Sequence, residues 1–160
     1  MGMTLLQLIR IMEATALRQA AVNSVVENDV FRINSLPDVK YGVFAWTQGT
    51  HVGNTDSSLR TFVFSLFYVD RLTPDKRNQV EVQSVGFDVI GAVLRRLEED
   101  FDVEVGEWTY TPFNQRFTDE CAGGFAQVRL TVPIDDLCPN DSHPGDFNDD
   151  FGDDFWVLVM

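Results

Sequence analysis

The stretch LRTFVFSLFYVDR, residues 59–71, is the strongest structural signal in this chain of 160 residues. Aromatic and β-branched residues dominate it, which is typical of a β-strand. Alternation places Phe62, Phe64, Leu66 and Tyr68 on one face of that strand, and Val63, Phe67 and Val69 on the other. Both faces are largely apolar, although an antiparallel sheet in a small protein normally has one face covered by helices. The second face therefore indicates either contact with another subunit or burial under loops of the same chain.

Helices are predicted on both sides of this strand in the chain. Thr73, Pro74 and Asp75 supply an N-cap followed by proline at the first helical position, and this helix is predicted to continue to about residue 100. An earlier helix is predicted to begin after Thr4 and to run to about residue 26. It has one apolar stripe at helical spacing, formed by Leu5, Leu8, Ile9, Met12 and Ala16.

Three shorter strands are expected over residues 41–46, 103–111 and 125–132. A long polar loop is expected over residues 47–58, and a polar connection over residues 112–124. The resulting order is α-β-β-α-β-β. This order predicts an α+β fold in which two helices pack on one face of an antiparallel β-sheet.

The C-terminal residues differ in composition from the rest of the chain. We expect a domain over residues 1–138 and an extended acidic arm over residues 139–160, where helical and strand patterns are absent. Aromatic side chains in the arm are costly to leave in water, so we expect it to pack on its own domain or on a neighbouring protein. These side chains are Phe147, Phe151, Phe155 and Trp156.

The charge of the chain limits its partners. Twelve Lys and Arg face 25 Asp and Glu, for a net charge of -13, and residues 135–160 contain eight Asp but no Lys or Arg. Such a field repels phosphate backbones and anionic lipid surfaces. We therefore expect neither sequence-specific DNA binding nor a membrane partner.

Targeting and redox signals are absent from the sequence. Arg10 and Glu13 interrupt the apolar N-terminal residues, which excludes a signal peptide. No apolar run approaches the roughly 18–20 residues that a membrane helix needs. Cys121 and Cys138 are 17 positions apart and fit no zinc or CxxC pattern. We expect a soluble protein with two reduced thiols.

Catalytic chemistry is not indicated by the histidines. Catalysis needs a positioned base beside a group that it can activate. His51 lies in the polar loop, where we expect it to be solvated, and His143 lies in the arm. Asp141 and Ser142 directly precede His143, and side chains so close in sequence do not form a triad. We expect no enzymatic activity and no cofactor.

The arm also contains an acidic run, over residues 146–154, whose spacing is similar to that of a calcium-binding loop. The similarity fails because Phe151 occupies the position of the required glycine and Val157 that of the bidentate glutamate. We expect no dedicated metal site. Weak cation binding by this run remains an alternative to a purely solubilising role.

Four stretches of the sequence carry a resemblance to a known family. They are YVDRL at residues 68–72, the helix at 84–100, DVEVGE at 102–107 and FNQRFTDECAG at 113–123. On these stretches the chain resembles neck and tail-completion proteins of tailed bacteriophages, especially the crAss-like phages of gut bacteria. The resemblance covers about residues 1–138 and leaves out the acidic arm.

The resemblance implies a tail-terminator-like fold and a structural role in the virion. Copies of the chain would assemble in the host cytoplasm into a ring of roughly six or twelve, the closed cyclic symmetry expected of such a subunit. The ring would join the portal to the tail, with adjacent portal, neck and tail proteins as partners. Genomic DNA would pass without sequence-specific binding, because an acidic channel repels phosphate.

Candidate interaction residues follow from this implied role. The loop at 47–58, with His51 and Asn54 inside it and Trp46 at its border, would reach the channel or the next ring. Phe113 and Phe117 would anchor a neighbouring subunit, or else fill the core of their own subunit. The aromatic residues of the arm would dock on an adjacent ring protein.

A second function class is a small acidic regulatory or inhibitory protein. In this alternative the arm mimics nucleic acid and occupies a basic groove on a host enzyme. A monomer or dimer that binds a basic partner in a salt-sensitive way would favour the mimic, whereas a ring would favour the neck protein.

Overall fold

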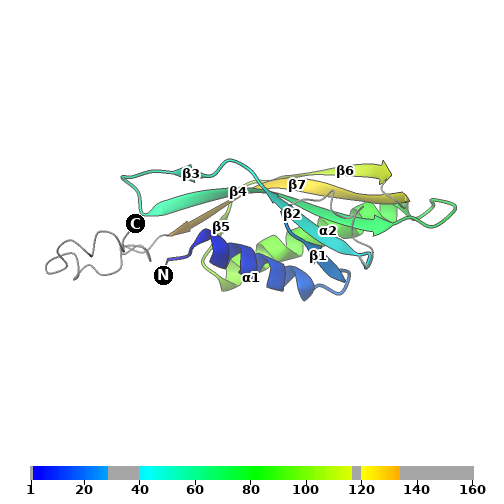
Figure 1. Ribbon diagram of the computed structural model, residues 1–160, viewed down its shortest axis with the longest axis horizontal. Coiled ribbons are helices and arrows are strands. Elements are labelled where there is room, and N and C mark those ends of the chain that lie inside the picture. Colours follow the sequence, from blue (N-terminus) through cyan, green and yellow to red (C-terminus); the bar gives the residue numbers. More distant parts are fainter. Residues whose placement is uncertain (1, 29–39, 117–119, 134–160) are drawn as a thin grey trace, which may run out of the picture.

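The computed structural model describes residues 2–28, 40–116 and 120–133 (Figure 1). These residues form a mixed α+β fold with one seven-stranded sheet and two helices. The helices, α1 (Leu5–Leu17) and α2 (Gln79–Asp100), lie on the same side of the sheet. The acidic arm predicted for residues 139–160 lies outside the described residues.

The sheet is built around its longest strands. Its members are β1 (Ser24–Val26), β2 (Val43–Gln48), β3 (Val52–Gly53), β4 (Leu59–Arg71), β5 (Glu104–Val105), β6 (Thr109–Arg116) and β7 (Glu120–Pro133). The order is β1-β2-β4-β7-β5, and β3 also pairs with β4 while β6 also pairs with β7. The pair β1–β2 is parallel, and the other described pairs are antiparallel. The sheet is therefore mixed, not purely antiparallel as predicted.

The strand predicted at residues 59–71 is confirmed at both ends as β4. It pairs with β7 from Leu59 opposite Pro133 to Arg71 opposite Cys121. Its even-numbered aromatic and aliphatic side chains are buried on the side of the helices. The local alternation of the sequence therefore identified the central strand of the fold.

Helix α1 begins where it was predicted but ends nine residues early, at residue 17 instead of 26. Thr4 caps it through a reciprocal pair of bonds, because the backbone N–H of Gln7 donates to Thr4 Oγ1 at 3.1 Å and that of Thr4 donates to Gln7 Oε1 at 2.8 Å. Residues 24–26 instead form β1 beside β2. The β-branched pair Val25 and Val26 favours a strand over a helix once a partner strand is available.

Helix α2 begins at Gln79, not after Thr73 as predicted. The residues between form a turn: Lys76 N–H donates to the carbonyl of Thr73 at 2.8 Å, and Thr73 N–H donates to Asn78 Oδ1 at 2.8 Å. Lys76 adopts a φ of 59°. A left-handed residue at this position prevents a continuous helix from Pro74 onward.

The predicted polar connection at residues 112–124 is wrong, because most of it is strand. Strands β6 and β7 pair as a hairpin from Thr109 opposite Gln127 to Arg116 opposite Glu120. The loop predicted at residues 47–58 is also shorter, since β2 extends to Gln48 and β3 pairs with β4. Both the hairpin and β3 were missed because strands at the edge of a sheet contain polar residues and lack a continuous apolar pattern.

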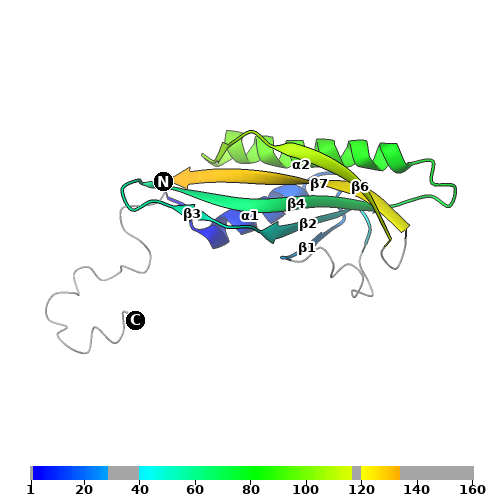
Figure 2. The same ribbon diagram turned by 90° about the horizontal axis from the view of Figure 1, so that it is seen from above.

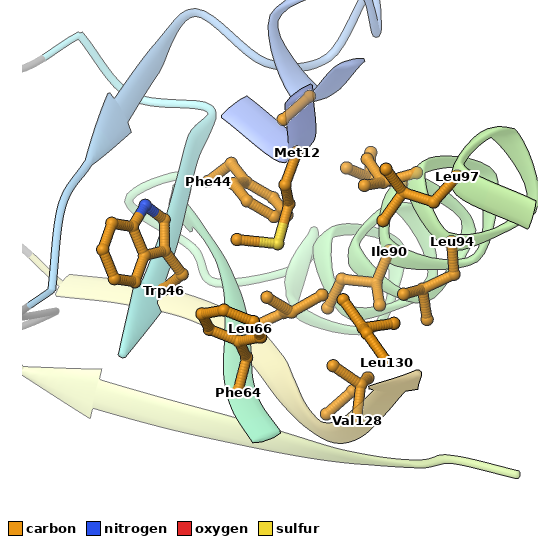
Figure 3. Packing of buried hydrophobic residues seen from close by; sticks show 14 of the residues in the cluster. Met12, Phe44, Trp46, Phe64, Leu66, Ile90, Leu94, Leu97, Val128 and Leu130 are labelled. Carbon is orange, nitrogen blue, oxygen red and sulfur yellow. The ribbon is translucent and has the colours of Figure 1, made fainter. Parts of the chain in front are cut away.

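The hydrophobic core lies between the sheet and both helices (Figure 3). Side chains from α1, α2 and the strands β2, β4 and β7 point toward one another there. They include Met12, Phe44, Trp46, Phe64, Leu66, Ile90, Leu94, Leu97, Val128 and Leu130. Both predicted helices therefore contribute their apolar faces to a single core.

Substitution of Gly123 tests the close pairing of β4 and β7. A Cβ at this position would overlap the backbone carbonyl of Tyr68, which cannot rotate away, whereas a Cβ at Gly53 has no atom within 4 Å. We expect Gly123→Ala to lower the free energy of unfolding by about 1–3 kcal/mol. Gly53→Ala should change it by less than about 0.5 kcal/mol. Urea unfolding of both variants measures the difference, and equal effects would contradict this packing.

Candidate interaction site

An exposed group of aromatic rings lies between α2 and β6. Phe87 is 50% exposed, which is the largest exposure of any aromatic residue in the described ranges. Its ring centroid is 5.4 Å from that of Trp108 and 5.1 Å from that of Tyr110. Val80, 72% exposed, precedes Phe87 by two helical turns on the same side of α2. We call these four residues the aromatic surface.

Gly86 lets β6 approach α2 closely enough to form this surface. A Cβ at Gly86 would lie 2.5 Å from the Tyr110 hydroxyl oxygen, whereas one at Gly91 would make ordinary contact with the Trp108 ring at 3.7 Å. The Tyr110 hydroxyl donates to the carbonyl of Gln83 at 2.7 Å. Burial raises the pKa of Tyr110 to about 12, so the hydroxyl stays protonated and remains a donor. Tyr110 is thus anchored, whereas half of the Phe87 side chain remains exposed.

The face of the sheet opposite the helices is apolar only at one end. There Val43, Ala45, Val69 and Cys121 are buried, and Phe67 packs on Phe125 with ring centroids 5.7 Å apart. Toward the other end the same face is polar: it carries Ser65, Gln127 and Arg129, and a hydrogen bond of 2.9 Å joins the hydroxyls of Thr61 and Thr131.

The second face of β4 is fully covered by the chain itself only at one end. Val69 is completely buried within the chain. Val63 and Phe67 are only partly buried. The odd-numbered side chains of β4 therefore do not form one continuous exposed apolar surface, and contact of this face with another subunit stays a prediction.

A groove lies where α1 begins and α2 ends. Its volume is about 470 Å³, and it is lined by Gly2, Met3, Gln7, Arg10, Ile11, Asp100, Phe101 and Asp102. The Met3 N–H donates to the Pro133 carbonyl at 3.1 Å, which fixes the N-terminal residues beside the end of β7. We call this feature the end groove. It combines apolar side chains with the exposed carboxylates of Asp100 and Asp102 and the exposed guanidinium of Arg10.

Trp46 belongs to the core and is only 4% exposed. Its indole N–H donates to Glu13 Oε2 at 2.8 Å. Burial raises the pKa of Glu13; the Trp46 hydrogen bond opposes this effect and the negative charge of Glu27 adds to it. The position of Trp46 next to a predicted loop suggested an interaction residue, but strand pairing opposite Leu66 turns it toward the helices.

His51 has a structural position at the edge of β4. Its Nδ1 accepts from the Val63 N–H at 3.1 Å, and its Nε2 lies 2.8 Å from Gln48 Oε1. The imidazole ring also packs against Phe62 and Phe64. His51 therefore occupies the edge of β4 between the segments paired with β2 and β3, and is not simply solvated as expected.

The remaining predicted interaction residues lie apart from one another. Asn54 is exposed and shapes a turn, because its Oδ1 accepts from the Asp56 N–H at 2.8 Å. Phe113 is partly buried against the apolar end of the outer sheet face. Outside the described residues lie Phe117, Phe147, Phe151, Phe155 and Trp156.

Sequence reasoning missed all four members of the aromatic surface. One signal could have indicated Phe87: it is a large aromatic residue that falls outside the wide apolar stripe of its helix. Trp108 and Tyr110 gave no such signal, because they join the surface only through the packing of β6 on α2.

The described part of the chain shows neither a metal-ligating cluster nor a membrane-spanning helix. Those residues hold no group of three His, Cys, Asp or Glu side chains positioned to bind a metal ion. Neither α1 nor α2 is both long and apolar enough to cross a membrane.

Comparison with known proteins finds no match to any family model and no match to any curated protein. The geometry of the exposed surfaces is therefore the structural basis for a functional proposal.

The raised pKa of Glu13 predicts a specific pH dependence of stability. The folded state holds the Glu13 proton more tightly than the unfolded state, so this contribution to stability is lost as pH rises through the folded pKa. Glu13→Gln keeps an acceptor for Trp46 but cannot ionise. We expect this variant to gain stability relative to the wild type as the pH rises from the ordinary pKa of a glutamate through that of folded Glu13. Urea unfolding across this range measures the difference.

A second variant sharpens this test. Trp46→Phe removes the hydrogen bond that favours the charged carboxylate, so the pH dependence caused by Glu13 should become steeper. Parallel stability curves for the wild type and Glu13→Gln across the range would contradict the assignment.

Proposed function

We propose that the chain is a structural virion protein of a tailed phage that forms a ring in the head–tail neck. In this role it acts as a connector or tail terminator, joins the portal to the tail and surrounds the path of the DNA. The observation that carries the proposal is the aromatic surface, which a single copy leaves half exposed at Phe87. Exposed clusters of aromatic side chains are typical of the centre of protein–protein interfaces.

The charge distribution supports the same proposal. Exposed carboxylates gather near the end of α2 and the following strand, at Glu98, Glu99, Asp100, Asp102 and Glu104. Together with the net charge of -13, they make a ring of many copies strongly anionic. Such a ring repels phosphate groups, so DNA would pass through it without adhering.

Purified particles of the phage that encodes the chain test this proposal directly. Mass spectrometry should detect the polypeptide in intact particles, and electron microscopy should place it in a closed ring between portal and tail. Particles that contain none of it would exclude a structural role. If the purified chain instead bound a basic protein in a salt-sensitive 1:1 complex, the alternative of an acidic nucleic-acid mimic would be favoured.

The aromatic surface predicts a difference between two exposed apolar residues. Phe87→Ser should lower the free energy of unfolding by about 1 kcal/mol at most, because half of this side chain is already in water. It should weaken self-association at least about tenfold, as expected for an aromatic residue at the centre of an interface. Sedimentation velocity measures the association of the full chain.

Leu17→Ser is the matched control for this prediction. Leu17 is 53% exposed, at the end of α1, and contacts none of the rings of the aromatic surface. We expect it to leave self-association within about twofold of the wild type, as for a surface substitution away from an interface. Equal effects of the two substitutions would exclude the aromatic surface as a specific contact.

A further inference from the structure

The turn before α2 and the groove at its end carry net charges of opposite sign. The turn, residues 73–78, contains Asp75, Lys76 and Arg77, and the end groove contains Arg10, Asp100 and Asp102. We call residues 73–78 the basic turn. The 22 residues of α2 separate the two features by about 33 Å at 1.5 Å per residue. Helix α2 runs along the long axis of the molecule (Figures 1 and 2).

The end groove has the chemistry to hold a long basic side chain. Met3, Ile11 and Phe101 line it with apolar side chains, Asp100 and Asp102 contribute two carboxylates, and Arg10 contributes one guanidinium, so its net charge is negative. Asp100 already pairs with Arg96 at 3.2 Å, but among the described residues no cation lies within ion-pair distance of Asp102. The aliphatic stem of an arginine or lysine packs on apolar surface while its charged end reaches a carboxylate.

The basic turn presents Arg77 as such a side chain, whereas Lys76 is already paired with Glu120 at 3.1 Å. The Arg77 side chain is 87% exposed, and its ion pair with Asp75 at 3.3 Å is also exposed. An ion pair of this kind contributes little in water, so Arg77 can exchange its partner at small cost. The bonds from Thr73 to Asp75 and to Asn78 hold the backbone of the turn in place. A preformed turn loses little conformational entropy when it binds.

A second copy of this chain supplies an occupant of suitable charge. The basic turn cannot reach the groove of its own chain, because α2 holds the two features apart. The acidic residues at 135–160 have the same sign of charge as the rim of the groove and no Lys or Arg to offset it. A second copy of this chain brings a basic turn of complementary charge.

We propose that the end groove of one copy binds the basic turn of the next, with Arg77 directed at Asp102. Such a contact is heterologous, since two different surfaces of the chain meet, and its repetition produces rings or open filaments. It deepens the proposed function, and its closure into a neck ring rests on that function. The pairing of groove and turn does not depend on the proposed function.

Charge reversal of both sides tests this contact in the full chain. Arg77→Glu and Asp102→Arg should each weaken self-association at least about tenfold, because each places like charges together. The double variant restores opposite charges in every contact, so its association should return to within about threefold of the wild type, as a coupled pair predicts. Sedimentation velocity at low salt measures all three, and added salt should weaken wild-type association.

Two control variants have the same changes of net charge. Arg129→Glu and Asp56→Arg reverse exposed residues that line neither the groove nor the turn. They should leave association within about twofold of the wild type. Equal losses in these controls, failure of the double variant to recover, or a chain that stays monomeric at millimolar concentration would each overturn the contact.

The outcomes separate this contact from the proposed function. If the charge reversals leave association unchanged, the contact between groove and turn is excluded, and a neck ring would have to form through other surfaces. If association depends on these charges but purified particles lack the protein, the contact is supported and the neck role is excluded.

Discussion

The pairing of β4 with β7 is the constraint on which the rest of this structure depends. The two strands pair over 13 residues of β4, and every other strand except β1 attaches to one of them. Their shared inner face supplies the surface on which α2 packs, and α1 in turn packs beside α2. This pairing joins residues about 60 positions apart on average, so its loop-closure entropy must be offset by the core it creates.

Local signals explain which elements could be predicted from the sequence. β4 was placed correctly because its aromatic and β-branched residues are contiguous, and the start of α1 because its capping box is contained in four residues. The end of α1 and the presence of β1 depend on a parallel partner that is 17 or more positions away, beyond the reach of propensity. The hairpin of β6 and β7 was missed because its polar residues and glycines are typical of loops.

The interaction residues were harder to predict because exposure depends on register. Trp46 borders a polar segment, yet its pairing opposite Leu66 points it into the core, where it bonds to Glu13. His51 lies in a polar segment typical of a solvated loop, yet its Nδ1 accepts the Val63 N–H at the edge of β4. Phe87 shows the opposite case: it lies on the solvent side of α2 and stays half exposed although Tyr110 and Trp108 lie beside it. Composition alone does not distinguish these outcomes.

The charges of α2 explain why a contact between copies would stabilise this fold beyond its own core. The last turn of α2 contains Glu98, Glu99 and Asp100 and no basic residue. These carboxylates oppose the helix dipole, which favours cations at the C-terminus by about 0.3–1 kcal/mol each, whereas at the N-terminus Glu81 in the first turn is favourably placed. A single copy therefore carries an unfavourable arrangement at the C-terminal end of its main helix. In the proposed head-to-tail contact, Arg77 of the next copy meets these carboxylates and offsets that arrangement.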